Sequence, residues 1–248
     1  MNLQEFLDKL PNTNKKVVSI FSGGLDSTVL TYALVKKYGK ENVIALSYQY
    51  RQKHQIELEC SKYTANKLGI KQKFIDISFL GEINKDFSSL ANDSSIETPD
   101  GKEVIEEKQS SNYIANRNSI LINIAVSFAE TVDAEYVFYG AQSNDYAGFW
   151  DCTTDFVNSL NNTFKLNREH TIQVVAPFMG LWKEDEIKLG VDLDVDFTTA
   201  WTCYNPQREE VMVDGKKGHY LKPCKKCLSC VERMEAFNKA GVEDKQYV

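Results

Sequence analysis

Two groups of residues have the types and spacing to do chemistry. The first is Ser22-Gly23-Gly24-Leu25-Asp26-Ser27, which follows the apolar run 17–21 and precedes a helical pattern that ends near Gly39. The order is therefore strand, glycine turn and helix. Two glycines let the backbone turn tightly and aim several N–H groups at one point. The start of the helix adds unpaired donors and a partial positive charge. This stretch predicts a binding site for an anion such as a phosphate.

The second group consists of Cys203, Cys224, Cys227 and Cys230. Four thiolates suit a tetrahedral metal, zinc first and iron second. Disulfides are disfavoured because the sequence shows no export signal. A site closed by four cysteines leaves no position for water, so we expect one structural zinc per chain that fixes the C-terminal tail. His219 lies between the ligands and could replace one, but the four cysteines already suffice.

The elements that must position these groups alternate along the chain. Apolar runs predict strands at 17–21, 43–48, 74–77, 136–139 and 172–175. Helical patterns lie at 56–68, 117–131 and 156–164, and a short one ends at Gly190. This alternation predicts an α/β fold, a Rossmann-like parallel sheet with helices on both faces. Ligands of such sheets bind at the carboxyl ends of the strands, where the glycine turn would lie.

Two stretches break this alternation. Residues 81–112 are polar and show no sustained periodicity, so we expect a partly mobile insertion beside the active site. Residues 211–221, between the cysteines, look like a hairpin. We therefore predict a catalytic domain at 1–200 and a cysteine-bearing, zinc-binding region at 201–248.

Composition limits the possible classes of protein. The chain has 248 residues, is 42% hydrophobic and 26% charged, and carries a net charge of −6. These are the proportions of a globular protein, and no apolar run of about 18 residues predicts a membrane helix. The N-terminus lacks the apolar centre of a signal peptide, which favours a cytoplasmic protein. The acidic balance argues weakly against a nucleic-acid partner.

Several motifs carry a family resemblance. The glycine turn has no Gly-Lys-Ser/Thr, as a Walker A motif would, and instead resembles the SGGxDS pyrophosphate loop (PP-loop) of enzymes that cleave ATP between the α and β phosphates. Nearly the whole chain resembles the 7-cyano-7-deazaguanine synthase (QueC) family. The matching stretches are Phe21 to Thr28, 50–54, 116–118, 144–152, 176–179, Lys183, 202–204 and the cysteine cluster. Arg51, Ala115 and a longer segment between Cys203 and Cys224 depart from the family pattern.

The resemblance implies an adenine nucleotide alpha hydrolase-like fold and an ATP-dependent reaction. A 7-carboxy-7-deazaguanine carboxylate is adenylated and converted by ammonia to an amide, and a second adenylation leads to the nitrile. No part of the chain is left for a glutaminase domain, so free ammonium is the expected nitrogen donor. Mg²⁺ would accompany ATP, and the resemblance implies a homodimer.

The resemblance also implies residue roles. The ATP-binding residues would be Phe21, Ser22, Gly23, Gly24, Leu25, Asp26, Ser27 and Thr28. The catalytic residues would be Asp26, Ser27, Arg117, Asp145 and Lys183. Asp26 is expected to bind Mg²⁺ or water, and Lys183 to contact the leaving phosphates. The substrate-binding residues would be Asp145, Tyr146, Phe149 and Asp151, with aromatic side chains for stacking on a flat heterocycle. His54 is a further candidate.

Three alternatives remain. A tRNA-thiolating enzyme of the same fold would share the first loop and often carries cysteine pairs. A QueC-like enzyme could attach the deazapurine to a protein or a nucleic acid, so that activation stops at the adenylate or amide. A non-enzymatic zinc-binding module would tolerate substitution of Asp26.

Overall fold

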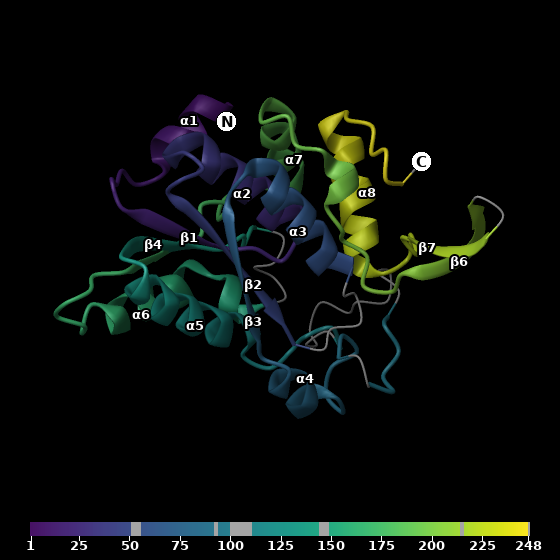
Figure 1. The fold of residues 1–248 in the computed structure, drawn as a ribbon, viewed down its shortest axis with the longest axis horizontal. Helices are drawn as coiled ribbons and strands as arrows, with labels where there is room; N and C mark the ends of the chain where they lie inside the picture. The colour runs from purple at the N-terminus through teal and green to yellow at the C-terminus, as the bar shows by residue number, and fades with distance from the viewer. Residues whose placement is uncertain (51–55, 92–93, 100–110, 144–148, 214–215, 248) are drawn as a thin grey trace.

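The computed structural model describes residues 1–50, 56–91, 94–99, 111–143, 149–213 and 216–247 (Figure 1). Its centre is one five-stranded sheet in the order β3-β2-β1-β4-β5, with every neighbouring pair parallel. The strands are β1 (Lys16–Ile20), β2 (Val43–Gln49), β3 (Lys71–Asp76), β4 (Ala134–Phe138) and β5 (Gln173–Val175). The predicted parallel α/β sheet is therefore confirmed, with strand ends displaced by a few residues.

Alternation along the strands sends neighbouring side chains to opposite faces. Val17 packs into one core with helices α1 (Leu3–Lys9), α2 (Leu25–Tyr38) and α7 (Lys183–Asp192). Val18 packs into the other with α5 (Arg117–Thr131) and α6 (Thr154–Phe164). Helix α3 (Ile56–Leu68) places Ala65 in the Val17 core. Helices thus cover both faces, as the sequence predicts.

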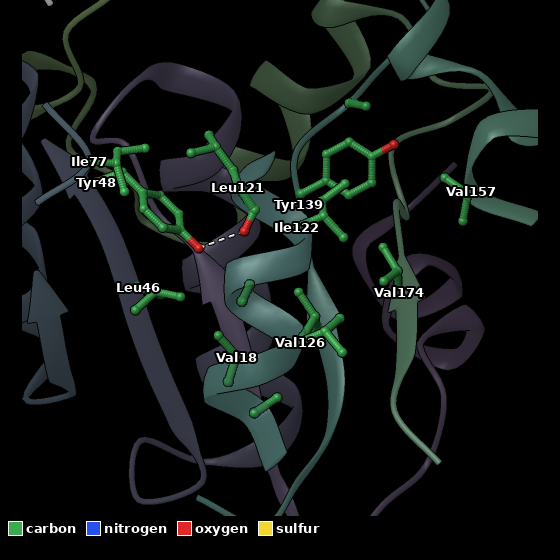
Figure 2. Close-up of a cluster of buried hydrophobic side chains, with 14 of the residues drawn as sticks. Val18, Leu46, Tyr48, Ile77, Leu121, Ile122, Val126, Tyr139, Val157 and Val174 are labelled. Atoms are coloured by element: carbon green, nitrogen blue, oxygen red, sulfur yellow. Dashed lines mark hydrogen bonds between the residues drawn. The ribbon is translucent and has the colours of Figure 1, made fainter. Parts of the chain in front are cut away.

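The core on the Val18 face also ties down the end of β2 (Figure 2). Leu46 and Ile122 are fully buried there, and the buried Tyr48 donates its hydroxyl to the carbonyl of Leu121 at 2.7 Å. This bond fixes α5 against β2. The first residue of α5, Arg117, is thereby held at the carboxyl end of the sheet.

The C-terminal region begins with irregular backbone and the antiparallel pair β6 (Gln207–Val213) and β7 (Lys216–Lys222), which confirms the predicted hairpin. The hairpin projects away from the sheet, whereas α8 (Leu228–Ala240) lies beside α7 (Figure 1). Buried Ala236 and Phe237 of α8 pack with Ile187 of α7 and Leu25 of α2. The cysteine region is thus packed on the sheet domain, and a boundary at residue 200 stays a prediction.

Three helices, α1, α4 (Phe79–Asn84) and α8, were not anticipated. Helix α1 begins at a capping box in which Asn2 and Glu5 bond each other's backbone N–H groups. Helix α4 opens the stretch expected to be irregular, and Leu90 and Ala91 beyond it are buried. Part of the 81–112 segment is therefore packed, while residues 92–93 and 100–110 lie outside the described residues. Within the described ranges, no helix is long and apolar enough to cross a membrane.

Candidate active site

A cavity of about 230 Å³ opens at the carboxyl end of the sheet, where the glycine turn follows β1. Segments from the whole length of the chain line it, which fits the usual ligand position in open parallel sheets. We call one part the loop side, formed by Ser22, Gly24–Ser27, Lys183 and Glu232. We call the other the aromatic side, formed by Tyr50, Tyr113, Arg117, Phe149 and Asp151.

The glycine turn has the geometry that an anion loop requires. Gly23 has a φ of 91°, a region that other residues rarely adopt. A Cβ on Gly23 would lie 2.1 Å from the carbonyl oxygen of Glu57 in α3. The Ser27 hydroxyl accepts from the N–H groups of Ser22 and Gly23 at 3.3 Å each, and Ser22 Oγ accepts from Gly24 N–H at 3.0 Å. Three backbone donors therefore converge on two serine oxygens inside one turn.

The other predicted loop residues have supporting positions. Phe21 is buried in the Val17 core and Leu25 packs with Ile187 and Phe237, and both also line the cavity. The Thr28 side chain is fully buried and does not line the cavity, so its hydroxyl is set behind the loop. Gly140, after β4, approaches the first turn of α2 so closely that a Cβ would lie 3.3 Å from Ser27 N.

A buried lysine lies between two carboxylates on the loop side. Lys183 Nζ is 3.5 Å from Asp26 Oδ1 and 3.7 Å from Glu232 Oε2, and only 7% of its side chain is exposed. Burial raises the pKa of Glu232, and Lys183 opposes that rise. Asp26 and Lys183, both predicted from the sequence, are therefore brought together, and Glu232 is added to them.

Arg117 is the basic group on the aromatic side. Burial works against its charge, but the electrostatic influence of Tyr50, Tyr204 and Asp151 leaves the pKa of Arg117 above its ordinary value. Asp151 is 2% exposed, and burial raises its pKa while Arg117 opposes the rise. The Asn118 N–H donates to Asp151 Oδ2 at 3.4 Å. This arrangement places a cation and an acid on one wall.

Stacked and edge-on rings complete the aromatic side. The rings of Tyr113 and Phe149 are 6.3 Å apart and inclined by 27°. The Trp150 indole N–H donates to the Tyr113 hydroxyl at 2.9 Å, and its ring meets Phe156 edge-on. The wall is therefore fixed by ring contacts and can offer a flat apolar surface. The predicted residues Asp145 and Tyr146 lie outside the described residues, as do Arg51 and His54.

The four cysteines form one cluster. Their sulfur atoms lie within 4.8 Å of one another, and three of the four residues are buried. Backbone N–H groups point at the sulfurs, from Cys224 to Cys203 at 3.1 Å and from Cys227 to Cys224 at 3.3 Å. This donor set fits a thiolate-bound metal. His219 lies in β7, opposite Glu210, and is not one of the four ligands.

Sequence reasoning missed several lining residues. Glu232 and Ser229 come from α8, and Tyr204 follows Cys203 in the region assigned only to metal binding. Tyr204 is influenced electrostatically by both Arg117 and Lys183, so it connects the two sides. Nothing in the sequence distinguishes Glu232 from its neighbour Glu235. Tyr113 adjoins the irregular segment and had no pattern to mark it.

The parallel sheet, with a glycine turn and a cavity at its carboxyl edge, defines an α/β fold with a candidate anion-binding loop. Solved structures of similar fold include the U34-tRNA thiolase NcsA from Methanococcus maripaludis, at a TM-score of 0.51 and 16% identity over 78% of this chain and 62% of that one. The NH3-dependent NAD synthetase from Campylobacter jejuni matches at a TM-score of 0.51 and 16% identity, over 80% of this chain and 76% of that one. Both likenesses concern the fold alone.

The particular family is shown by sequence. The model of the family described as "Queuosine biosynthesis protein QueC" matches residues 16–241, and this chain belongs to that family. The 7-cyano-7-deazaguanine synthase 1 of Colwellia psychrerythraea is 38% identical over 93% of this chain and 97% of that relative. The 7-cyano-7-deazaguanine synthase of Caldicellulosiruptor saccharolyticus is 35% identical over 92% of this chain and 93% of that relative. The predicted resemblance is confirmed, and the tRNA-thiolating alternative is not favoured.

Proposed function

We propose that this chain converts 7-carboxy-7-deazaguanine and ammonia to 7-cyano-7-deazaguanine at the expense of two ATP molecules. The observation that carries the proposal is one cavity that joins an SGGLDS turn and a buried lysine to an aromatic wall with Arg117, in a chain of the QueC family. The first side suits a triphosphate. The second suits a flat heterocycle that bears a carboxylate.

The first half of the reaction makes an acyl adenylate. A substrate carboxylate oxygen attacks the α-phosphorus of ATP, and the bond to the β-phosphate oxygen breaks to release pyrophosphate. Negative charge grows on the leaving phosphates, so fixed donors aimed at them lower the barrier. The N–H groups now held by Ser22 Oγ and Ser27 Oγ are the candidate donors, and Lys183 supplies the positive charge.

The second half replaces oxygen by nitrogen. Ammonia attacks the acyl carbon, AMP leaves with the former carboxylate oxygen, and loss of a proton gives the amide. The amide oxygen then attacks the α-phosphorus of a second ATP, again releasing pyrophosphate. Departure of AMP and loss of two protons from nitrogen leave the nitrile. Both adenylations use the same loop side, so one phosphate site serves twice.

The substrate would bind at the aromatic side. The rings of Tyr113 and Phe149 offer stacking surface, and the Arg117 guanidinium can hold the carboxylate. Asp151 can accept hydrogen bonds from the guanine-like N–H edge. We retain Asp145 and Tyr146 as further proposed contacts on sequence grounds.

Two metals belong to the proposal. Asp26 would take Mg²⁺ that arrives with ATP, because its buried Oδ1 accepts no hydrogen bond in the described structure and has Lys183 Nζ as an ion-pair partner at 3.5 Å. Mg²⁺ would neutralise phosphate charge. Zinc would be held by Cys203, Cys224, Cys227 and Cys230 as a structural ion. We also propose a cytoplasmic homodimer, which light scattering of the purified protein would test.

A direct assay tests the function. The protein is incubated with 7-carboxy-7-deazaguanine, ¹⁵N-ammonium and Mg·ATP, and the products are followed by mass spectrometry. We expect AMP, pyrophosphate and a ¹⁵N-labelled nitrile. Lys183→Met should remove most of the AMP formation, whereas Lys188→Met, at an exposed position of the same helix, should not. ADP in place of AMP would refute the proposal. AMP with amide but no nitrile would favour the redirected QueC-like enzyme.

A further inference from the structure

Glu232 belongs to the cysteine region in sequence and to the ATP end of the cavity in space. Its Oε2 lies 3.7 Å from Lys183 Nζ, and the same lysine is 3.5 Å from Asp26 Oδ1. Lys183 thus pairs with one carboxylate from the glycine turn and with one from the cysteine-bearing region. If the cysteine cluster only fixed the C-terminal tail, it would not need this contact between Glu232 and Lys183.

The position of Glu232 follows from how α8 is anchored. Cys227 is the N-cap of α8, and Cys230 lies in its first turn, so the cluster fixes the start of the helix. Further along, Ala236 and Phe237 pack against Ile187 of α7. Lys183 begins α7, which lies beside α8 (Figure 1). Glu232 therefore lies between the cysteine cluster and a packed core, close to the lysine.

We propose that Glu232 is a positioning residue, which holds Lys183 between two carboxylates so that its ammonium group meets the leaving phosphates, and that the cysteine cluster acts on catalysis through this residue. The inference rests on the proposed function, since it assigns Lys183 to the phosphates of ATP. Glu232 itself need not touch ATP.

Glu232 would act on the alignment of the Lys183 ammonium group and not on the attraction between the site and ATP. With Glu232 present, Lys183 is pulled from two directions, so neither carboxylate alone fixes it. Without that charge, Lys183 is drawn toward Asp26, away from the developing charge of the transition state. Because Glu232 is an anion near a polyphosphate site, its removal does not weaken the attraction for ATP. The loss should therefore fall on kcat and not on KM for ATP.

The test compares Glu232→Gln with Glu235→Gln, whose side chain is exposed one turn further along the same helix. We expect Glu232→Gln to lower kcat for AMP formation about tenfold, with KM for ATP unchanged or lower. Glu232→Asp keeps the charge on a shorter stem and should recover part of the loss. Glu235→Gln should behave as wild type.

Two further measurements separate positioning from a structural role. In a Lys183→Met background, Glu232→Gln should cost nothing more, because the residue through which it acts is gone. Metal content and melting temperature should match those of the wild type. The inference is overturned if kcat of Glu232→Gln stays within about twofold of wild type, if its effect is additive with Lys183→Met, or if its loss follows loss of metal. Failure of the wild type to form AMP would instead refute the proposed function.

Discussion

The loop side and the aromatic side of the cavity are built in opposite ways. The core of the loop side is six consecutive residues, whose hydrogen bonds close within one turn around Ser27 Oγ. The aromatic side draws its residues from three separate parts of the chain, at Tyr50, at Tyr113 and Arg117, and at Phe149 and Asp151. A phosphate needs only backbone donors at a helix start, which one local motif supplies. Recognition of a particular heterocycle needs several side chains at fixed distances, which only the whole fold supplies.

The loop side also depends on residues that are distant in the sequence. The backbone N–H of Trp201 donates to the Gly23 carbonyl at 3.0 Å. The fully buried Arg233 of α8 donates to the Ala200 carbonyl and to both carboxylate oxygens of Asp244. The hydrogen bonds within the turn are therefore local, whereas the residues that hold the turn in place are distant in the sequence. This dependence gives the largest expected effects.

Disruption of the four-cysteine cluster, the proposed metal site, should have the largest effect. Cys230→Ser breaks the thiolate set at the first turn of α8, and we expect a loss of about 4 kcal/mol or more in unfolding free energy, with a melting temperature lower by about 8–16 °C. AMP formation should fall with it. Metal analysis and calorimetry measure the change. Cys60→Ser, outside the cluster, is the matched control and should retain the metal. Full metal loss without thermal destabilisation would contradict a structural site.

Gly23→Ala should have the next largest effect. A Cβ there would lie 2.1 Å from Glu57 O and 2.8 Å from Ser61 N, and both are backbone atoms of α3 that cannot move aside. With the strain of a positive φ, the unfolding free energy should fall by about 2–4 kcal/mol in urea titrations.

Gly24→Ala provides the contrast for that variant. Gly24 has a φ of −72°, and its nearest neighbour would be the movable Ser22 Oγ at 3.2 Å. Its unfolding free energy should fall by about 1 kcal/mol or less. Equal losses in the two variants would show that close packing on α3 does not shape the loop.

Asp151→Asn should separate the two sides by kinetics. Loss of this buried carboxylate should raise KM for the deazapurine by about 10- to 100-fold, because a hydrogen-bond acceptor is replaced by a group that can also donate. KM for ATP should change less than about twofold, since the loop side is intact. Initial rates with each substrate varied in turn test this. Asp155→Asn, exposed in α6, is the control. An equal rise in both KM values would mean that the sides do not act separately.

The contrast also explains what the sequence could predict. The SGGLDS turn could be predicted because the whole motif lies in six consecutive residues. The cysteine cluster could be predicted because all four of its ligands are of one residue type and three of them are closely spaced. Arg117 was assigned a role because it lies in the 116–118 stretch that matches the family, at the start of a periodic helix, and that role stays a prediction. Glu232 could not be found, because its role depends on how α8 docks on α7, and Glu235 has the same local surroundings in sequence.

The packed part of the irregular segment was missed for a related reason. Asn84 is buried, and its side chain accepts from Ala115 N–H at 2.9 Å and donates to Leu80 O at 2.9 Å. Ser89 donates to Asn112 in the same way. Polar residues that satisfy one another in the interior leave no apolar periodicity, so the sequence suggested a loose insertion.

The smallest effect is the pH dependence of stability at Asp151. Burial raises its pKa above the ordinary 3.8, so between 3.8 and the higher folded value the folded state holds the proton more firmly than the unfolded state. Its contribution to stability is therefore complete below pH 3.8 and is lost as the pH rises through the folded pKa. Asp151→Asn cannot titrate, so the stability of wild type relative to this variant should decrease across that window.

Asp196 should show the opposite slope. The Thr198 hydroxyl lowers its pKa, so its contribution is present above pH 3.8 and is lost as the pH falls through the folded pKa. Urea titrations of wild type, Asp151→Asn and Asp196→Asn between about pH 3 and 7 compare the two slopes. Arg117→Met should widen the Asp151 window upward, because Arg117 opposes the rise of that pKa. If the stability of wild type relative to Asp151→Asn instead rose with pH, as expected for Asp196→Asn, the fold would stabilise Asp151 as an anion. Hydrogen bonds to Asp151, rather than its burial, would then determine its pKa.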